Sequence, residues 1–299
     1  MKKVVWICGF VLLVVTYGAA TVKVVTTLPD LASIAREIGG DKVSASSIAT
    51  GYQNPHFVDP KPSYIIKLSK ADVFITVGLD LETGWSPSLL QSSRNPKIQK
   101  GAKGYVDASE GVALLQVPNS ISRQQGDIHI YGNPHYWLDP QRGKIIAKNI
   151  CKGLSRVAPS EAAYFSSRLA LFNQKIDKKD KEWKQLMMPY RGRKVIAYHN
   201  EWCYFESHFG FKIMDFLEPK PGIPPTPSQL VKVINLIKQH HIKVIITSPY
   251  FSTKSADVVA RQTGAKVVAL ATSVGAFDGI DSYFKLFDYN IKKLRIALK

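Results

Sequence analysis

Residues 160–188 read SEAAYFSSRLALFNQKIDKKDKEWKQLMM, a stretch that contains neither glycine nor proline. Its large apolar residues recur at roughly helical spacing, at Tyr164, Leu169, Leu171, Phe172, Ile176, Trp183 and Leu186. This pattern predicts a single helix that starts at the turn formed by Pro159 and Ser160. At a rise of about 1.5 Å per residue, the helix would be about 40 Å long. We therefore expect a rigid helix over residues 159–190 in place of a flexible linker.

Short β-branched runs alternate with helical patterns on both sides of this stretch. The segments before it are strand-like at 23–27, 43–48 and 73–77 and helical at 30–38 and 63–70. The segments after it are strand-like at 194–198, 212–217, 244–247 and 266–270 and helical at 228–239 and 280–298. This alternation predicts mostly parallel sheets with helices on both faces. We expect an α/β fold with two doubly wound lobes, at residues 21–158 and 191–299, joined by the one long helix.

Residues 1–20 have the composition of an export signal. A lysine pair precedes the apolar run 4–16, and small residues follow at 18–20. The apolar run is too short to span a bilayer comfortably, so we expect cleavage near Ala20 and a periplasmic protein. An uncleaved N-terminal anchor is the alternative. Cys8 lies inside the apolar run, which is a poor setting for lipid attachment.

The chain of 299 residues carries 40 lysines and arginines against 23 acidic residues, a formal net charge of +17. Such an excess on its own suggests an anionic partner such as nucleic acid. The lysines of the central helix, however, are interleaved with acidic residues at the spacing of helical ion pairs, which predicts a solvated face. No nucleic-acid-binding motif accompanies them, so we expect no nucleic-acid partner.

The three cysteines, Cys8, Cys151 and Cys203, lack the C-x-x-C spacing of a thiolate metal cluster. Cys151 and Cys203 fall in separate helical segments, so we expect both to be free thiols. Any bound metal must then be held by imidazole and carboxylate groups. Seven histidines are available for that role.

One short motif occurs twice and contains a histidine each time. His56 lies in NPHFVDP at 54–60, and His135 lies in NPHYWLDP at 133–140. The proline before each histidine restricts the backbone, and each Asp-Pro pair predicts a helix start with the aspartate as N-cap. Each histidine is therefore expected on a short, stiff connection directly before a helix.

His199 follows the strand-like run 194–198, which places it at the carboxyl end of a strand in the second lobe. Open parallel sheets bind ligands at that edge. We therefore expect His56, His135 and His199 to converge on one metal site in the cleft between the lobes.

The other four histidines are expected outside this site. His129 is predicted to be an exposed loop residue, with a mobile metal-capturing group as the alternative. The remaining three are expected to be structural or superficial: His208, His240 and His241.

Three neutral imidazoles and one oxygen donor form a tetrahedral set suited to Zn(II), and a carboxylate in place of an imidazole would favour Mn(II). Glu218 is the preferred fourth ligand, because it follows the strand-like run 212–217 at the edge that also carries His199. Asp278, Glu201 and a water molecule are the alternatives.

Several spaced motifs in the same order give the mature chain a family resemblance: TTLP at 26–29, NPH at 54–56, NPHYWLDP at 133–140, AYH at 197–199, DSY at 281–283 and DYN at 288–290. The chain resembles the metal-specific solute-binding proteins of bacterial ABC importers, the zinc and manganese group. The resemblance implies two α/β lobes joined by one backbone helix, with the metal between them. It also implies that His56, His135 and His199 are three of four ligands.

The chain departs from this family in two places. The family usually has an aspartate ligand in a T-D-S stretch before the last helix, where this chain reads ATS at 271–273. The long loop rich in histidine and acidic residues that many zinc members carry is also missing, with only Asp127 and His129 in the corresponding segment.

The predicted function is the capture of Zn(II) in the periplasm and its delivery to an ABC permease at the cytoplasmic membrane, by a monomer that is not an enzyme. An Mn(II)-specific binding protein is the first alternative. An exported zinc hydrolase with Glu201 as base is the second, but the chain has neither an H-E-x-x-H helix nor a G-x-S-x-G motif. Adhesion through the basic face is a third class and uses none of the histidine pattern.

Overall fold

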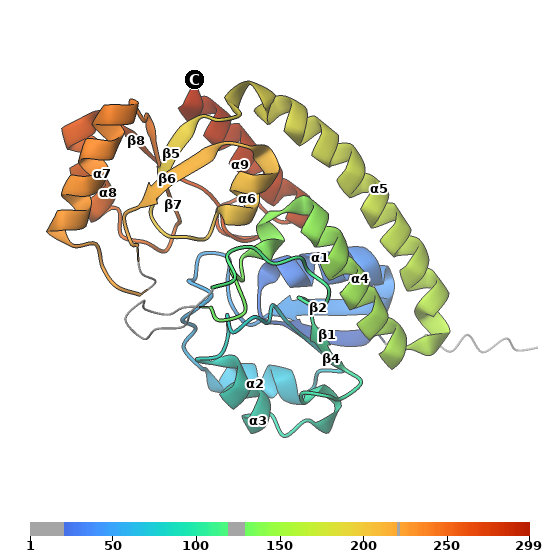
Figure 1. Ribbon diagram of the computed structural model, residues 1–299. Coiled ribbons are helices and arrows are strands. Elements are labelled where there is room, and N and C mark those ends of the chain that lie inside the picture. The colour runs from blue at the N-terminus through green and yellow to red at the C-terminus, as the bar shows by residue number, and fades with distance from the viewer. Residues whose placement is uncertain (1–20, 119–128, 220–221) are drawn as a thin grey trace, which may run out of the picture.

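The computed structural model describes residues 21–118, 129–219 and 222–299. The predicted export signal at 1–20 lies outside these residues. Figure 1 shows two lobes packed against each other, with one long helix along the side of both. Within the described ranges, no helix combines the length and the apolar character needed to cross a bilayer.

The N-terminal lobe contains a sheet of four parallel strands in the order β2-β1-β3-β4. The strands are β1 (Val22–Thr26), β2 (Val43–Ser47), β3 (Val73–Thr76) and β4 (Tyr105–Asp107). The helices are α1 (Pro29–Gly39), α2 (Pro62–Ser69), α3 (Ser86–Ser92) and α4 (Pro140–Val157). Every residue of β3 is buried, as expected for an inner strand of a covered parallel sheet. The carboxyl ends of β2 and β4 lead into the loops that carry His56 and His135.

The C-terminal lobe repeats this topology, with four parallel strands in the order β6-β5-β7-β8. The strands are β5 (Lys194–Ala197), β6 (Lys212–Phe216), β7 (Val244–Thr247) and β8 (Lys266–Ala269). The helices are α6 (Cys203–Phe209), α7 (Pro227–His240), α8 (Lys254–Thr263) and α9 (Tyr283–Leu298). His199 follows β5, and Glu218 follows β6.

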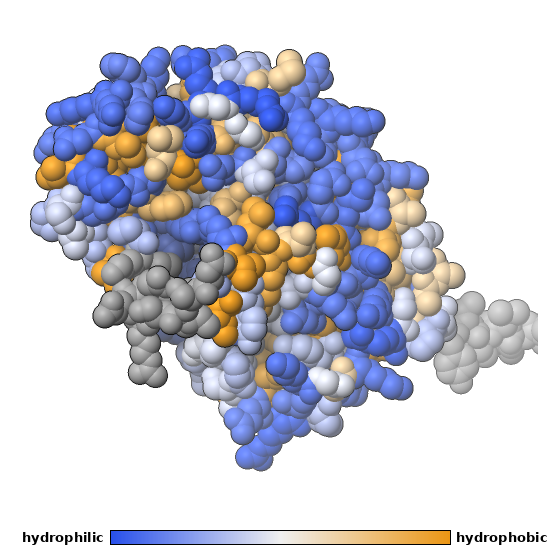
Figure 2. All heavy atoms as spheres, in the orientation of Figure 1, coloured by the Kyte–Doolittle hydropathy of each residue, from blue (hydrophilic) through white to orange (hydrophobic). Residues whose placement is uncertain are grey.

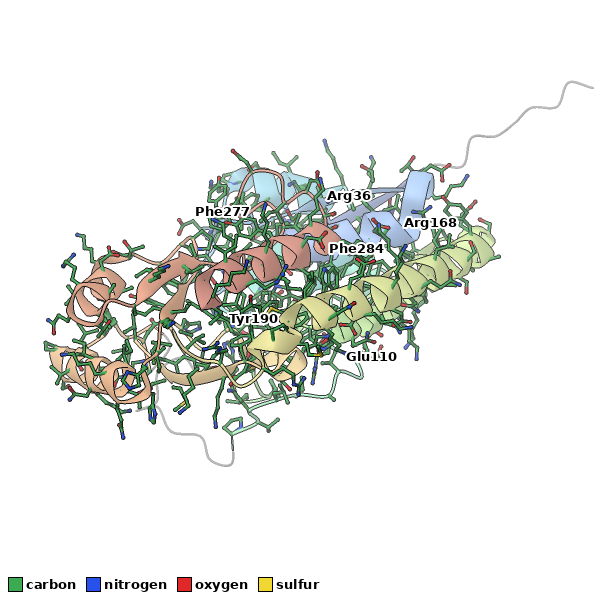
Figure 3. The ribbon with its side chains drawn as sticks, turned by 90° about the horizontal axis from the view of Figure 1, so that it is seen from above. Arg36, Glu110, Arg168, Tyr190, Phe277 and Phe284 are labelled. Carbon is green, nitrogen blue, oxygen red and sulfur yellow. The ribbon has the colours of Figure 1, made fainter. Side chains whose placement is uncertain are left out.

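The predicted linking helix is confirmed. Helix α5 (Ala162–Met187) has 26 residues and is continued by a short 3-10 turn at each end. The whole range 159–190 is therefore helical. Figure 3 shows α5 and α9 side by side, with Phe284 of α9 beside α5. The ring centroid of Phe284 lies 5.4 Å from that of Phe172 on α5. The helix is therefore packed against both lobes and does not bridge them through solvent.

One hydrophobic core runs through both lobes. It contains Ile75 of the first sheet, Trp183 of α5 and Phe205 of the second lobe. A smaller cluster, with Ile196 and Val233, covers only the other face of the second sheet. Moving the lobes apart would therefore expose apolar surface from the larger core, which costs roughly 25 cal/mol for each Å² exposed.

Buried hydrogen bonds also cross between the lobes. The indole N–H of Trp137 donates to the carbonyl oxygen of Thr272 at 2.8 Å. The hydroxyl of Tyr283 donates to the carbonyl oxygen of Trp137 at 2.5 Å, and the backbone N–H of Tyr283 donates to Ser33 at 2.9 Å. These bonds fix the turn after His135 against the segment before α9.

The observed first residues of the helices agree only in part with those predicted from the sequence. Asp139 is the N-cap of α4 as predicted, and its side chain accepts a hydrogen bond from the backbone N–H of Gln141 at 2.8 Å. The prediction is wrong for Asp59, because α2 begins later, at Pro62, which supplies the fixed φ of the first turn. The last helix begins three residues later than predicted, at Tyr283, behind a serine N-cap.

Cys151 and Cys203 are buried and free, which confirms that prediction. Burial raises the pKa of the Cys203 thiol to about 12 and raises the pKa of the Cys151 thiol above its ordinary range. Both side chains are therefore protonated core residues rather than thiolate ligands.

Candidate metal centre

The two N-P-H motifs hold their histidines by the same local arrangement. The side-chain oxygen of Asn54 accepts a hydrogen bond from the backbone N–H of His56 at 3.0 Å, and Asn133 does the same for His135 at 3.0 Å. Such a turn offers the backbone a fixed alternative to helix or strand. The second copy is held further by the hydroxyl of Tyr204, which donates to the carbonyl oxygen of Asn133 at 2.7 Å. The repeat in the sequence is thus a repeated structure that positions two imidazoles.

Three imidazoles of the N-terminal lobe form one group. A ring nitrogen from each of His56, His129 and His135 lies within 4.8 Å of the other two. The Nε2 atoms of His56 and His135 are 3.3 Å apart. Two nitrogens that bind one tetrahedral ion at about 2.0–2.1 Å are separated by about this distance. These histidines can therefore share a single metal ion.

His199 faces this group from the C-terminal lobe. Its ring centroid lies 5.7 Å from that of His56 and 6.0 Å from that of His135. Its Nδ1 lies 2.7 Å from Oε2 of Glu218, and the other carboxylate oxygen of Glu218 accepts a hydrogen bond from the backbone N–H of Gly222 at 3.1 Å. The structure thus brings the three predicted histidines together between the lobes, and the carboxylate of Glu218 contacts Nδ1 of His199.

The surroundings keep the grouped imidazoles neutral at pH 7. Burial, reinforced by the neighbouring imidazoles, lowers the pKa of both His56 and His135 well below 6.5. Burial, followed by the influence of His199, lowers the pKa of His129 to about 4. Neutral imidazoles offer their lone pairs to a cation. The group is therefore ready to bind a metal without first releasing protons.

The sequence predicts an exposed loop residue at His129, and this prediction is wrong. The side chain is half-buried, and its ring stacks on that of His56 with the centroids 4.9 Å apart. Its Nε2 is buried and has no hydrogen-bond partner among the described residues. The only feature of the sequence that could have indicated this position of His129 is that it lies six residues before His135. Asp127, in the same segment, lies outside the described residues.

Glu201 and Asp278, the two alternative carboxylate ligands, are not among the grouped donors in the described residues. Glu201 is fully buried and accepts hydrogen bonds from the hydroxyls of Ser248 and Tyr250. Burial raises its pKa above the ordinary range. Asp278 is exposed, and neither carboxylate belongs to the histidine group found in the described part of the chain.

The remaining histidines have structural or superficial positions, in agreement with the sequence. His208 lies between two carboxylates, with Nδ1 3.1 Å from Asp139 and Nε2 2.5 Å from Asp180. His240 lies near the end of α7, with its Nδ1 3.2 Å from the ammonium group of Lys194. His241 caps α7 in the left-handed conformation.

Comparison with known proteins agrees with this architecture. The family described as zinc-uptake complex component A, periplasmic (ZnuA), matches residues 24–297. The manganese ABC transporter substrate-binding lipoprotein PsaA of Streptococcus anginosus is 28% identical over 284 residues, which cover 92% of this chain and 89% of that protein. The metal ABC transporter substrate-binding lipoprotein FimA of Streptococcus parasanguinis is 28% identical over 289 residues, covering 94% and 90%.

Solved structures show the same fold. A crystal structure of ZnuA superposes with a TM-score of 0.80 at 24% identity, covering 93% of this chain and 100% of that one. The Mn-bound periplasmic metal-binding protein of Candidatus Liberibacter asiaticus gives a TM-score of 0.76 at 23% identity, with the same coverage.

The family match covers nearly the whole chain, and the solved structures agree with the two-lobed fold. Its members are substrate-binding proteins that work with a membrane permease, not enzymes, so the hydrolase alternative is wrong. The chain therefore belongs to the ZnuA family and is a metal-binding substrate-binding protein of an ABC importer.

Proposed function

We propose that this chain binds Zn(II) between its lobes through His56, His129, His135 and His199. The observation that carries the proposal is the group of neutral imidazoles, in which two Nε2 atoms lie 3.3 Å apart. Zn(II) in proteins is mostly four-coordinate and binds imidazole nitrogen at about 2.0–2.1 Å. Four imidazoles would complete that coordination shell.

Glu218, the fourth ligand that the sequence favours, has a different role in this proposal. Its Oε2 accepts the hydrogen bond from Nδ1–H of His199, which fixes the tautomer and leaves Nε2 of His199 for the metal. Carboxylates commonly orient metal-binding histidines in this way. In this proposal Glu218 is bonded to His199, and His129 takes the fourth position.

Mn(II) is the alternative cargo, because relatives such as PsaA are named for manganese. Imidazole donors suit Zn(II), whereas Mn(II) prefers carboxylate and other oxygen donors. No carboxylate belongs to the histidine group in the ranges that the structure describes. The family usually has an aspartate ligand in the middle of the stretch that reads ATS here. This chain has Thr272 at that position, which carries no carboxylate. The donor set therefore favours zinc.

The proposed role is capture and delivery without covalent chemistry. The protein would be a periplasmic monomer, produced when cleavage near Ala20 removes residues 1–20. It would present the ion to a permease of the cytoplasmic membrane. Its working units would be the lobes 21–158 and 191–299 and the helical link 159–190. Two apolar side chains close in sequence to candidate ligands are exposed: Phe57 at 61% and Tyr131 at 54%. Exposed apolar side chains of this kind could contribute to docking on the permease.

Titration of metal-free protein with Zn(II) and with Mn(II), each in competition with a chelator, tests this proposal. We expect one Zn(II) per chain and binding of Mn(II) that is weaker by roughly 100-fold or more. Alanine at each of the four histidines should weaken zinc binding by at least roughly tenfold. His240→Ala, which removes a histidine outside the group, is the matched control and should bind zinc like the wild type.

Two results would contradict the proposal. Tighter binding of manganese than of zinc would overturn the choice of metal. Full zinc affinity after His56→Ala, His135→Ala or His199→Ala would overturn the site itself.

A further inference from the structure

A cavity of about 600 Å³ lies beside the histidine group in the N-terminal lobe. Its wall includes His56 and His129, two of the proposed zinc ligands, together with Trp85 from the start of α3. The indole N–H of Trp85 donates to the carbonyl oxygen of Pro55 at 3.0 Å, which ties the cavity wall to the N-P-H turn. The cavity is large enough for a hydrated metal ion, and its wall carries two of the proposed ligand imidazoles.

The described part of this cavity's wall carries a charge opposite in sign to that of the whole chain. Its described lining includes two carboxylates, Asp59 and Asp80, and no lysine or arginine. Both aspartates are exposed, and neither forms an ion pair within the described residues. The chain as a whole carries a formal charge of +17. The described wall of the cavity is thus locally negative in a basic protein.

The backbone around Asp80 is held in an unusual conformation. Leu79 and Asp80 have φ values of 55° and 63°, in the left-handed region. The turn before them is fixed by the carboxylate of Glu82, which accepts hydrogen bonds from the backbone N–H groups of Val77 at 2.7 Å and Gly78 at 3.1 Å. The Asp80 side chain is therefore set at the cavity wall by a buried carboxylate.

Screening decides which charges an approaching cation responds to. At physiological ionic strength the Debye length is about 8 Å, so lysines on remote faces act weakly at the cavity. Carboxylates in the cavity wall lie within that range of a cation inside it. Charges arranged in a cleft can raise the association rate of an oppositely charged ligand by about tenfold or more.

We propose that this cavity is the access route of the hydrated divalent cation to the metal centre, and that Asp59 and Asp80 steer the ion toward His129 and His56. The inference rests on the proposed zinc-binding function and concerns the rate of capture. The two aspartates act before the ion loses its water and do not hold it afterwards.

Stopped-flow measurement of Zn(II) association with metal-free protein tests the route. Trp137, whose ring centroid lies 5.1 Å from that of His135, provides the fluorescence signal. The double variant Asp59→Asn with Asp80→Asn should associate about three- to tenfold more slowly at low ionic strength, with an unchanged dissociation rate. The control is Asp41→Asn, which removes one exposed carboxylate just before β2, at the opposite edge of the same sheet.

The salt dependence gives a second readout with a definite sign. Added salt should slow association with the wild type, because it screens an attraction at the cavity. It should speed association with the double variant or leave it unchanged, because only the repulsion by the remaining positive charge is left to screen.

Each contrary outcome has its own meaning. If the wild type binds one zinc but the double variant associates at the wild-type rate, the access route is wrong and the metal centre stands. If the double variant loses zinc through faster dissociation, the aspartates are ligands and the steering role is wrong. A wild-type protein that binds no zinc overturns the proposed function and this inference together.

Discussion

The asparagine of each N-P-H motif determines where its histidine points. In the second copy, the side-chain oxygen of Asn133 holds the backbone N–H of His135. Its side-chain nitrogen donates to the carbonyl oxygen of Asn200 in the other lobe at 2.8 Å. One side chain therefore fixes a ligand loop and connects it to the loop that carries His199.

We predict that Asn133→Ala weakens zinc binding by roughly tenfold or more, because loss of groups that orient ligands typically costs that much affinity. The measurement is a competition titration with a zinc chelator. The control is Asn173→Ala on α5, whose side-chain oxygen has no hydrogen-bond partner within the described chain. Equal affinity of the two variants would show that the Asn133 turn does not position His135.

At this scale the sequence predicts that His56, His135 and His199 lie close together, as they do in the structure, but it does not predict His129 beside them. The first two lie in a repeated motif, and His199 directly follows a strand, so local rules place all three. His129 lies in a loop without periodicity, and its position depends on packing against His56. The sequence also places Glu218 at the sheet edge that carries His199, but it cannot tell which ring nitrogen of His199 the carboxylate contacts.

Among the elements, α6 is joined to two others through His208. Its imidazole lies between Asp139, the N-cap of α4, and Asp180 of α5. Arg142 also pairs with Asp139, and Lys184 pairs with Asp180 at 3.0 Å. Burial opposes protonation of His208, but the hydrogen bonds and charges of the two aspartates outweigh it and raise the pKa above 6.5. The imidazolium thus holds a second-lobe helix to the first lobe and to the link.

The raised pKa of His208 predicts a pH dependence of stability. The folded state binds this proton more tightly than the unfolded state, so the stabilisation is complete below about pH 6.5 and is lost as the pH rises through the higher folded value. We expect His208→Gln to lower the free energy of unfolding by about 2 kcal/mol at about pH 6 and by less at about pH 9. Urea unfolding at the two pH values measures this. An equal loss at both would contradict a charged His208.

Element lengths were predictable where a periodic pattern is long. Helix α5 follows from the spacing of its apolar residues across 26 positions. Strand β4, only three residues from Tyr105 to Asp107, is too short to show any period and is missing from the sequence prediction. Its place at the sheet edge is set by pairing with β3, a contact between residues far apart in the chain.

For the whole molecule, the shared core sets how far the lobes can move. Apolar side chains of both lobes and of α5 form one cluster, and buried hydrogen bonds of Trp137 and Tyr283 cross the interface. The sequence predicts that the link is a rigid helix, but it cannot show which helix faces pack across the lobes. On the face shown in Figure 2, hydrophilic residues predominate and some hydrophobic patches are visible.

We predict that zinc binding leaves the overall shape nearly unchanged. A large hinge motion would have to open the core that the two lobes share. Small-angle X-ray scattering of metal-free and zinc-loaded protein should give superimposable curves. A clear decrease in the radius of gyration on zinc binding would show a large-angle closure and contradict this prediction.

The whole structure also accounts for part of the net charge of +17. Several of the lysines on α5 pair with acidic neighbours, as Lys184 does with Asp180 and Lys179 with Glu182. A basic protein that binds a cation must do so by local arrangement, with neutral imidazoles that overcome an unfavourable overall field.

X-ray absorption at the zinc edge of the loaded protein tests the central claim most directly, because it counts and identifies the atoms bound to the ion. We predict four nitrogen donors at about 2.0–2.1 Å with the multiple scattering of imidazole rings, and three such donors after His129→Ala. A first shell with a carboxylate oxygen that disappears in Glu218→Gln, or with fewer than three imidazoles, would contradict the four-histidine zinc site.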